Sequence, residues 1–340
     1  MGVFILKRLG LAMFVLVGLS ILIFIIARVI PGDPARTALG PHAPEYAAQN
    51  LREQMHLAKP IYAQYALWVK GVVTGGDFGM SLLTRRPVQE DIKELFPATL
   101  ELVGLAAVFM ALGGVILGVL AARSRGTWVD SLVRVISYLG IATPSFVWLI
   151  MFVLLFGYVW PIFPTGGRLS GGFALPPHIT GMVTVDSLVT ANFATFWNGL
   201  LHLVLPAIAL ALAGLSQAAR ITRSSMVDNM DKDYIALETA YGLSQRRIFS
   251  KYLLKISLIP TVSILALDIA SLFAWAFICE TIVSYPGLSR YGMQAILNKD
   301  LNAVVGTVMV LGAVFVLTTI VVDIVVAMLD PRIRLSRRAA

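Results

Sequence analysis

The chain has 340 residues, of which 58% are hydrophobic and only 14% are charged, and its mean hydropathy is +0.81. A soluble domain usually carries about 25% charged residues, so this composition excludes a soluble enzyme and favours apolar segments that lie in a bilayer. The net charge of +8 therefore bears on membrane orientation, and nucleic acid is not an expected partner.

Six stretches are long and apolar enough to cross a bilayer as helices. The first follows Lys7 and Arg8 like a signal peptide, but its apolar run is too long and no small-x-small cleavage site precedes Arg28, so we expect an uncleaved anchor. The sequence thus predicts an all-α polytopic membrane protein with six transmembrane helices, at about Leu9 to Ile30, Ala98 to Ala122, Leu132 to Trp160, Leu200 to Ala219, Ile256 to Val283 and Val304 to Leu329.

The distribution of basic residues predicts the orientation of these helices. An even number of spans puts both termini on one side, and this arrangement places 16 of the 27 basic residues there and 11 on the other. Eight of those 11 lie between Arg28 and Lys93, in a connection long enough for the positive-inside rule to act only weakly. We therefore expect both termini to be cytoplasmic.

Two connections on the outer side are too long to be simple turns. Residues 31–97 are expected to form a small helical subdomain, since Pro60 suits a first helical turn and an apolar stripe follows it at helical spacing. This stripe comprises Ile61, Tyr65, Trp68 or Val69, and Val72. It either packs as a cap on the spans or forms a surface for a partner. Residues 161–199 are rich in Gly and Pro and are expected to form an irregular loop.

The connection between the fourth and fifth spans, Arg220 to Lys255, is long, basic and well patterned. Helix formers run from about Met226 to Ala240, Gly242 can take a positive φ at a helix end, and Ser244 can cap a second helix. This pattern predicts a helix, a sharp bend and another helix. Such a short helix either docks into a groove of another protein or lies on anionic lipid headgroups.

Several catalytic patterns are missing from the sequence. No Gly-Lys pair occurs, so the phosphate-binding loop that ends in Gly-Lys-Ser/Thr is absent, and neither the His-Glu-x-x-His zinc pattern nor Gly-x-Ser-x-Gly is present. We therefore expect a transport subunit that is not an enzyme, has no nucleotide site of its own and holds no cofactor or metal.

The run from Asp233 to Ser244, with Arg247-Ile248 and Pro260 downstream, resembles the cytoplasmic EAA loop of permeases of bacterial ABC importers. In particular, the chain is similar to the dipeptide, oligopeptide and nickel permease family. Six further segments match that family in order along the chain: Ile30-Pro31-Gly32-Asp33-Pro34, Gly76 to Ser81, Arg86-Pro87-Val88, Pro97 to Leu102, Glu280 to Leu288, and Asp330-Pro331-Arg332.

This resemblance implies a type I ABC importer transmembrane fold with an extracytoplasmic helical insertion after the first helix. The resemblance also implies three parts of the chain. Residues 1–94 form an N-terminal anchor and extracytoplasmic subdomain, residues 95–329 form a transmembrane type-1 domain with its EAA loop at about 220–257, and residues 330–340 form a basic cytoplasmic tail. The implied partners in the bacterial inner membrane are a second, homologous permease, two ATPase subunits that use ATP and Mg, and an extracytoplasmic solute-binding protein.

The EAA loop is the segment that receives the ATPase stroke in such importers. Carried over residue by residue, the coupling positions here are Ala236, Glu238, Ala240, Gly242 and Leu243. The family usually has Ala-Arg-Ala-Lys-Gly where this chain has Glu238-Thr239-Ala240-Tyr241-Gly242, and often His where Tyr252 stands. The loss of two basic residues puts the family's ionic contacts with the ATPase in doubt.

A candidate translocation path comes from an acidic residue within the fifth span. Asp268 lies near the middle of that span, and Ser271 and Trp275 share its helical face. The carboxylate either lines a cavity or bonds to polar groups such as Thr318 or Thr319.

The expected function is the passage of short peptides across the cytoplasmic membrane, with nickel complexes or opine-like solutes as alternatives. From another class, the alternative is a stand-alone channel or ion-coupled carrier, although few ionisable residues lie within the spans.

Overall fold

The computed structural model describes residues 2–29, 44–54 and 58–329. Every named element in these ranges is a helix, and one isolated bridge joins Met80 to Pro87. The family segments at residues 30–34 and 330–332, and the basic tail, lie outside the described residues. The chain is therefore all-α, as its sequence predicts.

Among the described residues, five helices are long and apolar enough to cross a membrane, or up to six if one bent helix pair counts as a span. Some are far longer than the sequence indicates, since α5 and α9 have 36 and 38 residues. At 1.5 Å per residue these helices are roughly 55 Å long and exceed a bilayer core of about 30 Å, so they must tilt or project beyond it. The spanning helices are α1 (Gly2–Val29), α5 (Val88–Arg123), α9 (Phe193–Met230), α12 (Leu254–Ile282) and α14 (Leu301–Leu329).

The third predicted span is not one straight helix. Its first part, α6 (Trp128–Ala142), meets α7 (Ser145–Val153) and the continuing π-helical turn η1 (Leu154–Val159) at an angle of 108°. Pro144 at the break has no N–H to continue the ladder, and it forces Thr143 before it into an extended conformation with φ −101° and ψ 125°. The third expected span, Leu132 to Trp160, is therefore broken at Pro144 and is not one unbroken helix.

The helical boundaries also differ from the sequence prediction outside the membrane. Helix α5 begins at Val88 and continues through Pro97, so the division expected at residue 94 falls inside one continuous helix. The expected irregular loop over 161–199 is irregular only to residue 182, because α8 (Val183–Val189) and the first turns of α9 follow. Proline in a helix interior removes one backbone hydrogen bond and can break the helix, but Pro97 does not end α5.

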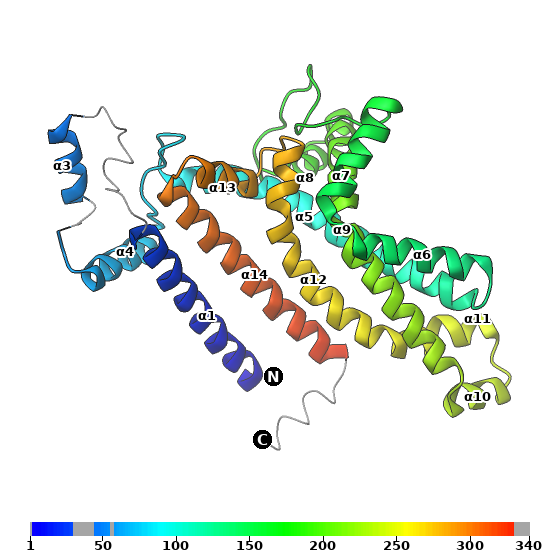
Figure 1. The fold of residues 1–340 in the computed structure, drawn as a ribbon. Coiled ribbons are helices and arrows are strands. Elements are labelled where there is room, and N and C mark those ends of the chain that lie inside the picture. The colour runs from blue at the N-terminus through cyan, green and yellow to red at the C-terminus, as the bar shows by residue number, and fades with distance from the viewer. Residues whose placement is uncertain (1, 30–43, 55–57, 330–340) are drawn as a thin grey trace.

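Helix α4 (Ile61–Gly75) lies beside one end of α1, and α3 (Glu45–Gln54) is drawn farther out on the same side (Figure 1). Tyr65 and Trp68 of α4 contact Phe24 of α1, with ring centroids 5.3 and 5.7 Å away, and the hydroxyl oxygens of Ser20 and Tyr65 are 2.8 Å apart. The apolar stripe after Pro60 thus packs on a span. Pro60 itself stands at the N-cap, directly before the first turn.

Helices α10 (Asp233–Ala240) and α11 (Gln245–Arg247) lie at the end of the bundle away from α13 (Leu288–Leu297), and the last described turn of α14 points toward that same end (Figure 1). The start of α6 is also there, because Arg125 beside it pairs with Asp231 beyond α9 at 3.4 Å. This end is called the α10 end below.

Small residues bring α5 and α9 into close contact. A Cβ built on Gly118 would lie 2.5 Å from Cβ of Thr222 and 2.7 Å from the carbonyl oxygen of Ala219, and Gly114 meets Ala218 in the same way. Real Cβ atoms do not approach so closely, so these two glycines set the distance between the helices.

We expect Gly118→Ala to destabilise the protein by about 1 to 3 kcal/mol, because the added methyl group overpacks this contact. Gly104→Ala is the matched control on the same helix, since nothing lies within 4 Å of a Cβ there. Alanine is the better helix former, so the control should be neutral or stabilising. Thermal unfolding in detergent measures both, and equal midpoints for the two variants would contradict the packing argument.

Candidate functional site

The predicted coupling residues lie on one short helix and the turn that follows it. Ala236, Glu238 and Ala240 belong to α10, and Gly242 and Leu243 form the turn before α11. Ala236, Ala240 and Gly242 are exposed, whereas Glu238 and Leu243 are half-buried. Helix α9 ends at Met230 and α10 begins at Asp233, so the single helix expected from Met226 to Ala240 is in fact two helices.

The turn after α10 has the conformation that the sequence predicts. Gly242 has φ 75°, a left-handed value that glycine adopts without steric cost. The backbone N–H of Leu243 donates to the carbonyl oxygen of Glu238 at 3.3 Å, and that of Gly242 donates to Thr239 at 3.0 Å. These two bonds make a Schellman motif, which ends the helix and satisfies its last carbonyl groups. Ser244 stands at the N-cap of α11, but its side chain makes no capping hydrogen bond.

Helix α10 is held against the ends of the spanning helices by a small apolar cluster. Buried Ala122, Met226 and Leu253 form its centre, and Ile235 of α10 packs against them. Beside the cluster, the hydroxyl group of Tyr234 donates to Oδ1 of Asn229 at 2.6 Å, and burial raises the pKa of Tyr234. These contacts fix α10 at a set angle to α9 and α12.

Two large apolar side chains are exposed on α10 and directly after it. Leu237 is 54% exposed and Tyr241, directly after the helix, is 74% exposed. Large apolar side chains that are exposed are typical of a surface that binds another protein. Tyr241 thus adds an exposed aromatic group beside the end of α10.

A buried polar network at the opposite end of the bundle was not predicted from sequence. Glu101 of α5 accepts a hydrogen bond from Arg168 at 2.8 Å, from the hydroxyl group of Tyr285 at 3.0 Å and from the backbone N–H of Thr184 at 2.5 Å. Arg168 also donates to the carbonyl oxygen of Gly181 at 2.6 Å. One carboxylate thus joins α5, the loop after η1, the start of α8 and the segment after α12.

The charges of this network are paired and largely withdrawn from solvent. Burial alone would lower the pKa of Arg168, but the neighbouring Tyr285 and Glu101 outweigh it and raise that pKa. Burial, together with the charge of Glu101, raises the pKa of Tyr285 well above its ordinary value. Arg168 therefore stays charged and Tyr285 stays neutral throughout the physiological range.

A second buried carboxylate, Glu280, lies next to this network. Thr99 donates to its Oε1 at 2.7 Å and the backbone N–H of Arg290 donates to its Oε2 at 2.8 Å. Gly287 leaves room for it, since a Cβ there would overlap the carboxylate. An acidic residue in an apolar segment was the available sequence signal for both Glu101 and Glu280, but it does not identify their partners.

The loop that carries Arg168 is pressed against the end of α12. The N–H of Gly167 donates to the carbonyl oxygen of Val283 at 2.8 Å, and a Cβ on Gly166 would lie 2.5 Å from that oxygen. Hydrogen bonds to Asp186 hold the far part of the loop in place. Burial would raise the pKa of Asp186, but its hydrogen bonds from Thr180, Ile179 and Gly181 lower it.

The candidate path residues lie on α12 as expected, but only Asp268 has a buried polar atom, its Oδ2, without a hydrogen-bond partner among the described residues. Thr319 donates to the carbonyl oxygen of Phe315 in its own helix, and Ser271 donates to that of Leu267. Trp275 is 52% exposed. In the described part of the chain, no three His, Cys, Asp or Glu residues are grouped to hold a metal ion.

Comparisons with known proteins agree with this arrangement. The family model described as "Binding-protein-dependent transport system inner membrane component" matches residues 114–335, and a model of the N-terminal part of such components matches residues 1–103.

Curated relatives match over nearly the whole chain. The probable D,D-dipeptide transport system permease protein of Escherichia coli (strain K12) is 39% identical over 321 residues, covering 94% of each chain. The dipeptide transport system permease protein of Alkalihalophilus pseudofirmus is 35% identical and covers 96% of this chain and 98% of its own. The di/tripeptide transport system permease protein of Pseudomonas aeruginosa is 35% identical, with 98% and 99% covered. This chain therefore belongs to the binding-protein-dependent transport system inner membrane components, as a multi-pass permease of an ABC importer.

Proposed function

We propose that this permease passes dipeptides across the inner membrane and is driven by separate ATPase subunits that dock on α10. The relatives at 35 to 39% identity whose names refer to dipeptide transport carry the proposal of the solute. The exposed side chains of Leu237 and Tyr241, on a helix that is held by an apolar cluster and a Schellman turn, support the proposal of docking. A homologous second permease and an extracytoplasmic solute-binding protein complete the proposed assembly.

The proposed solute is tested with the solute-binding protein that works with this permease. Titrations of L,L-dipeptides, D,D-dipeptides, nickel complexes and opine-like compounds should yield the tightest binding for a dipeptide. One of the relatives is a probable D,D-dipeptide permease, so both stereochemical series belong in the titration. Tightest binding of a nickel complex or an opine would contradict the proposed solute while leaving the ATP-driven mechanism intact.

The proposed orientation places both termini and α10 in the cytoplasm and the Arg168 network outside. In a Cys279→Ser background, Gly171→Cys should react with an impermeant thiol reagent from the outside and Glu238→Cys only after the membrane is opened. Cys279 is the lone cysteine of the chain, so its replacement removes background labelling. Nothing lies within 4 Å of a Cβ at Gly171, so the new side chain should cause little strain. Labelling of Gly171→Cys only from the cytoplasm would contradict this orientation.

Asp268 is proposed to line the path and to attract the ammonium group of a peptide. We expect Asp268→Asn, which keeps the shape but removes the charge, to reduce uptake of peptides with a free amino terminus about tenfold, as for a lost contact of roughly 1.4 kcal/mol. Uptake of amino-blocked analogues should change little, and these analogues are the internal control. Equal effects on both kinds of solute would assign Asp268 to helix packing.

A further inference from the structure

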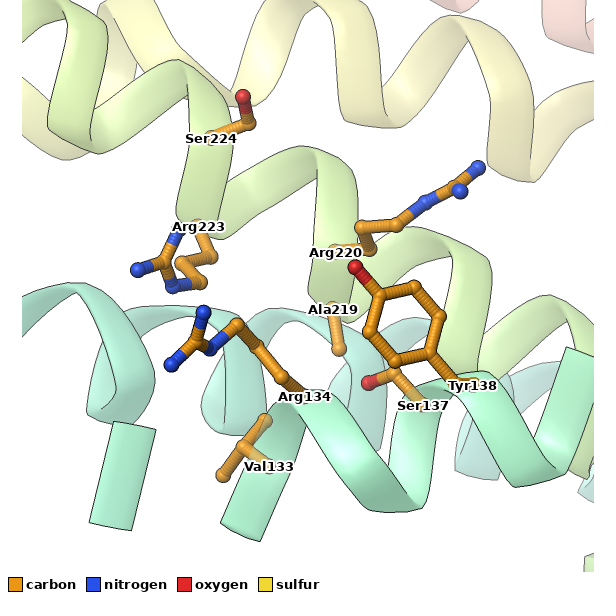
Figure 2. A pocket seen from close by; sticks show the side chains of 8 residues that line it. All are labelled: Val133, Arg134, Ser137, Tyr138, Ala219, Arg220, Arg223 and Ser224. Atoms are coloured by element: carbon orange, nitrogen blue, oxygen red, sulfur yellow. The ribbon is translucent and has the colours of Figure 1, made fainter. Parts of the chain in front are cut away.

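A basic cavity of about 200 Å³ lies between α6 and α9 (Figure 2). Arg134 and Tyr138 line it from α6, and Arg220, Arg223 and Ser224 line it from α9. In Figure 2, the guanidinium groups of Arg134 and Arg223 lie beside each other at one end, while Arg220 and the ring of Tyr138 stand at the other. The cavity is thus lined by cations and hydroxyl groups on an otherwise apolar pair of helices.

The positive charge of this cavity is only partly compensated. Asp130 accepts from Nε of Arg223 at 2.5 Å and from its Nη2 at 2.7 Å, and it lies 3.7 Å from Nε of Arg134. Within the described part of the chain, Arg220 has no ion-pair partner. Three arginines against one aspartate leave two positive charges, and an anion between these groups would relieve their repulsion.

The cavity lies close to the α10 end of the bundle. Arg134 is six residues after exposed Trp128 at the start of α6, and Arg223 is seven residues before the end of α9, which corresponds to roughly 10 Å along each helix. Tryptophan commonly sits at the membrane interface, so a charge within about 10 Å of Trp128 along α6 is within reach of phospholipid headgroups. Long arginine side chains can direct their charges toward that layer.

An exposed apolar stripe runs along α6 next to the cavity. Leu132, Val135, Ile136 and Leu139 are 40 to 53% exposed and lie on one side of the helix, while Val133 and Ser137 on the other side are buried. Arg134 and Tyr138, four residues apart, stand at the border between the two sides. A ligand that meets both surfaces needs a phosphate group and hydrocarbon chains together.

We propose that this cavity binds the phosphate headgroup of an anionic phospholipid, whose acyl chains follow the apolar stripe of α6. Arg134 and Arg220 hold the phosphate oxygens, Tyr138 supplies a hydroxyl donor, and Asp130 keeps Arg223 in place. Basic pockets between transmembrane helices are suited to such headgroups. The site is separate from the coupling surface and from the proposed path, so it does not depend on the transported solute.

Native mass spectrometry of the importer, purified with its partner subunits, tests this proposal. Offered equal amounts of phosphatidylglycerol and phosphatidylcholine, the wild-type protein should retain phosphatidylglycerol selectively. The variant Arg134→Gln with Arg220→Gln leaves the Asp130–Arg223 pair intact and should bind phosphatidylglycerol about 25-fold more weakly, at roughly fivefold per arginine. Arg246→Gln with Arg247→Gln removes two exposed charges outside the cavity and should retain the lipid.

Three results would overturn the proposal. The first is equal retention of the two lipids by the wild-type protein, a result that needs no variant to fold. The second is equal loss of phosphatidylglycerol from the cavity variant and the control variant. The third is displacement of the lipid by inorganic phosphate at concentrations comparable to the lipid, since the site would then recognise the anion without its acyl chains.

Discussion

Gly242→Val is expected to abolish most transport while leaving the protein folded. A β-branched residue at φ 75° adds about 1 to 3 kcal/mol of backbone strain, which is released when the turn changes its conformation. Nothing lies within 4 Å of a Cβ at this position, so the damage arises from the backbone and not from a clash. A changed turn tilts α10 and displaces Leu237 and Tyr241 from the proposed docking position.

We expect ATP-driven uptake and the stimulation of ATP hydrolysis to fall together by at least about tenfold, which corresponds to 1.4 kcal/mol. The matched control is Gly76→Val at the end of α4, where φ is 63° and no atom lies within 4 Å of a Cβ. It carries similar strain at a distance from α10 and should retain coupling. Normal uptake by well-expressed Gly242→Val protein would mean that α10 does not transmit the ATPase stroke.

Glu101→Gln is expected to cause the largest loss of stability. The side chains of Glu101 and Arg168 are only 3% and 15% exposed, so the substitution leaves a guanidinium group buried without its counter-charge. Removing one partner of a buried pair costs about 3 to 5 kcal/mol. The thermal unfolding midpoint in detergent should therefore fall sharply, and the contact between the Arg168 loop and α5 should loosen.

Two further variants make this prediction specific. Combining Glu101→Gln with Arg168→Gln removes both charges, so the double variant should be more stable than the sum of its single changes indicates. Glu94→Gln breaks an exposed pair with Arg86, whose side chain is 47% exposed, and should leave the midpoint nearly unchanged. Additive single effects, or a large effect of Glu94→Gln, would contradict the special status of the buried pair.

Features that depend on local sequence could be predicted, whereas those that depend on distant partners could not. The apolar runs indicated the spans, and the pattern around Gly242 indicated a helix, a turn with positive φ and a second helix, which the structure confirms. The break at Pro144 was missed because prolines within α5, α9 and α12 do not end those helices, so proline alone does not decide the outcome.

The buried network could not be derived because its members are far apart in the chain. Arg168 lies 67 residues after Glu101, and Tyr285 lies 184 residues after it. An acidic residue within an apolar span indicates a buried partner but does not identify that partner. The loop that carries Arg168 is rich in glycine, and nothing in its sequence distinguished this arginine. In the same way, Arg134 and Arg223 meet only because α6 and α9 pack side by side.

Uptake of a labelled dipeptide into proteoliposomes tests the central claim most directly. The vesicles contain this permease with its partner permease and ATPase subunits, and the solute-binding protein is added on the outer face. Uptake is expected only when ATP is supplied on the α10 side and the binding protein is present on the other. Uptake driven by an ion gradient alone, without ATP or the binding protein, would identify a carrier and would contradict the proposed mechanism.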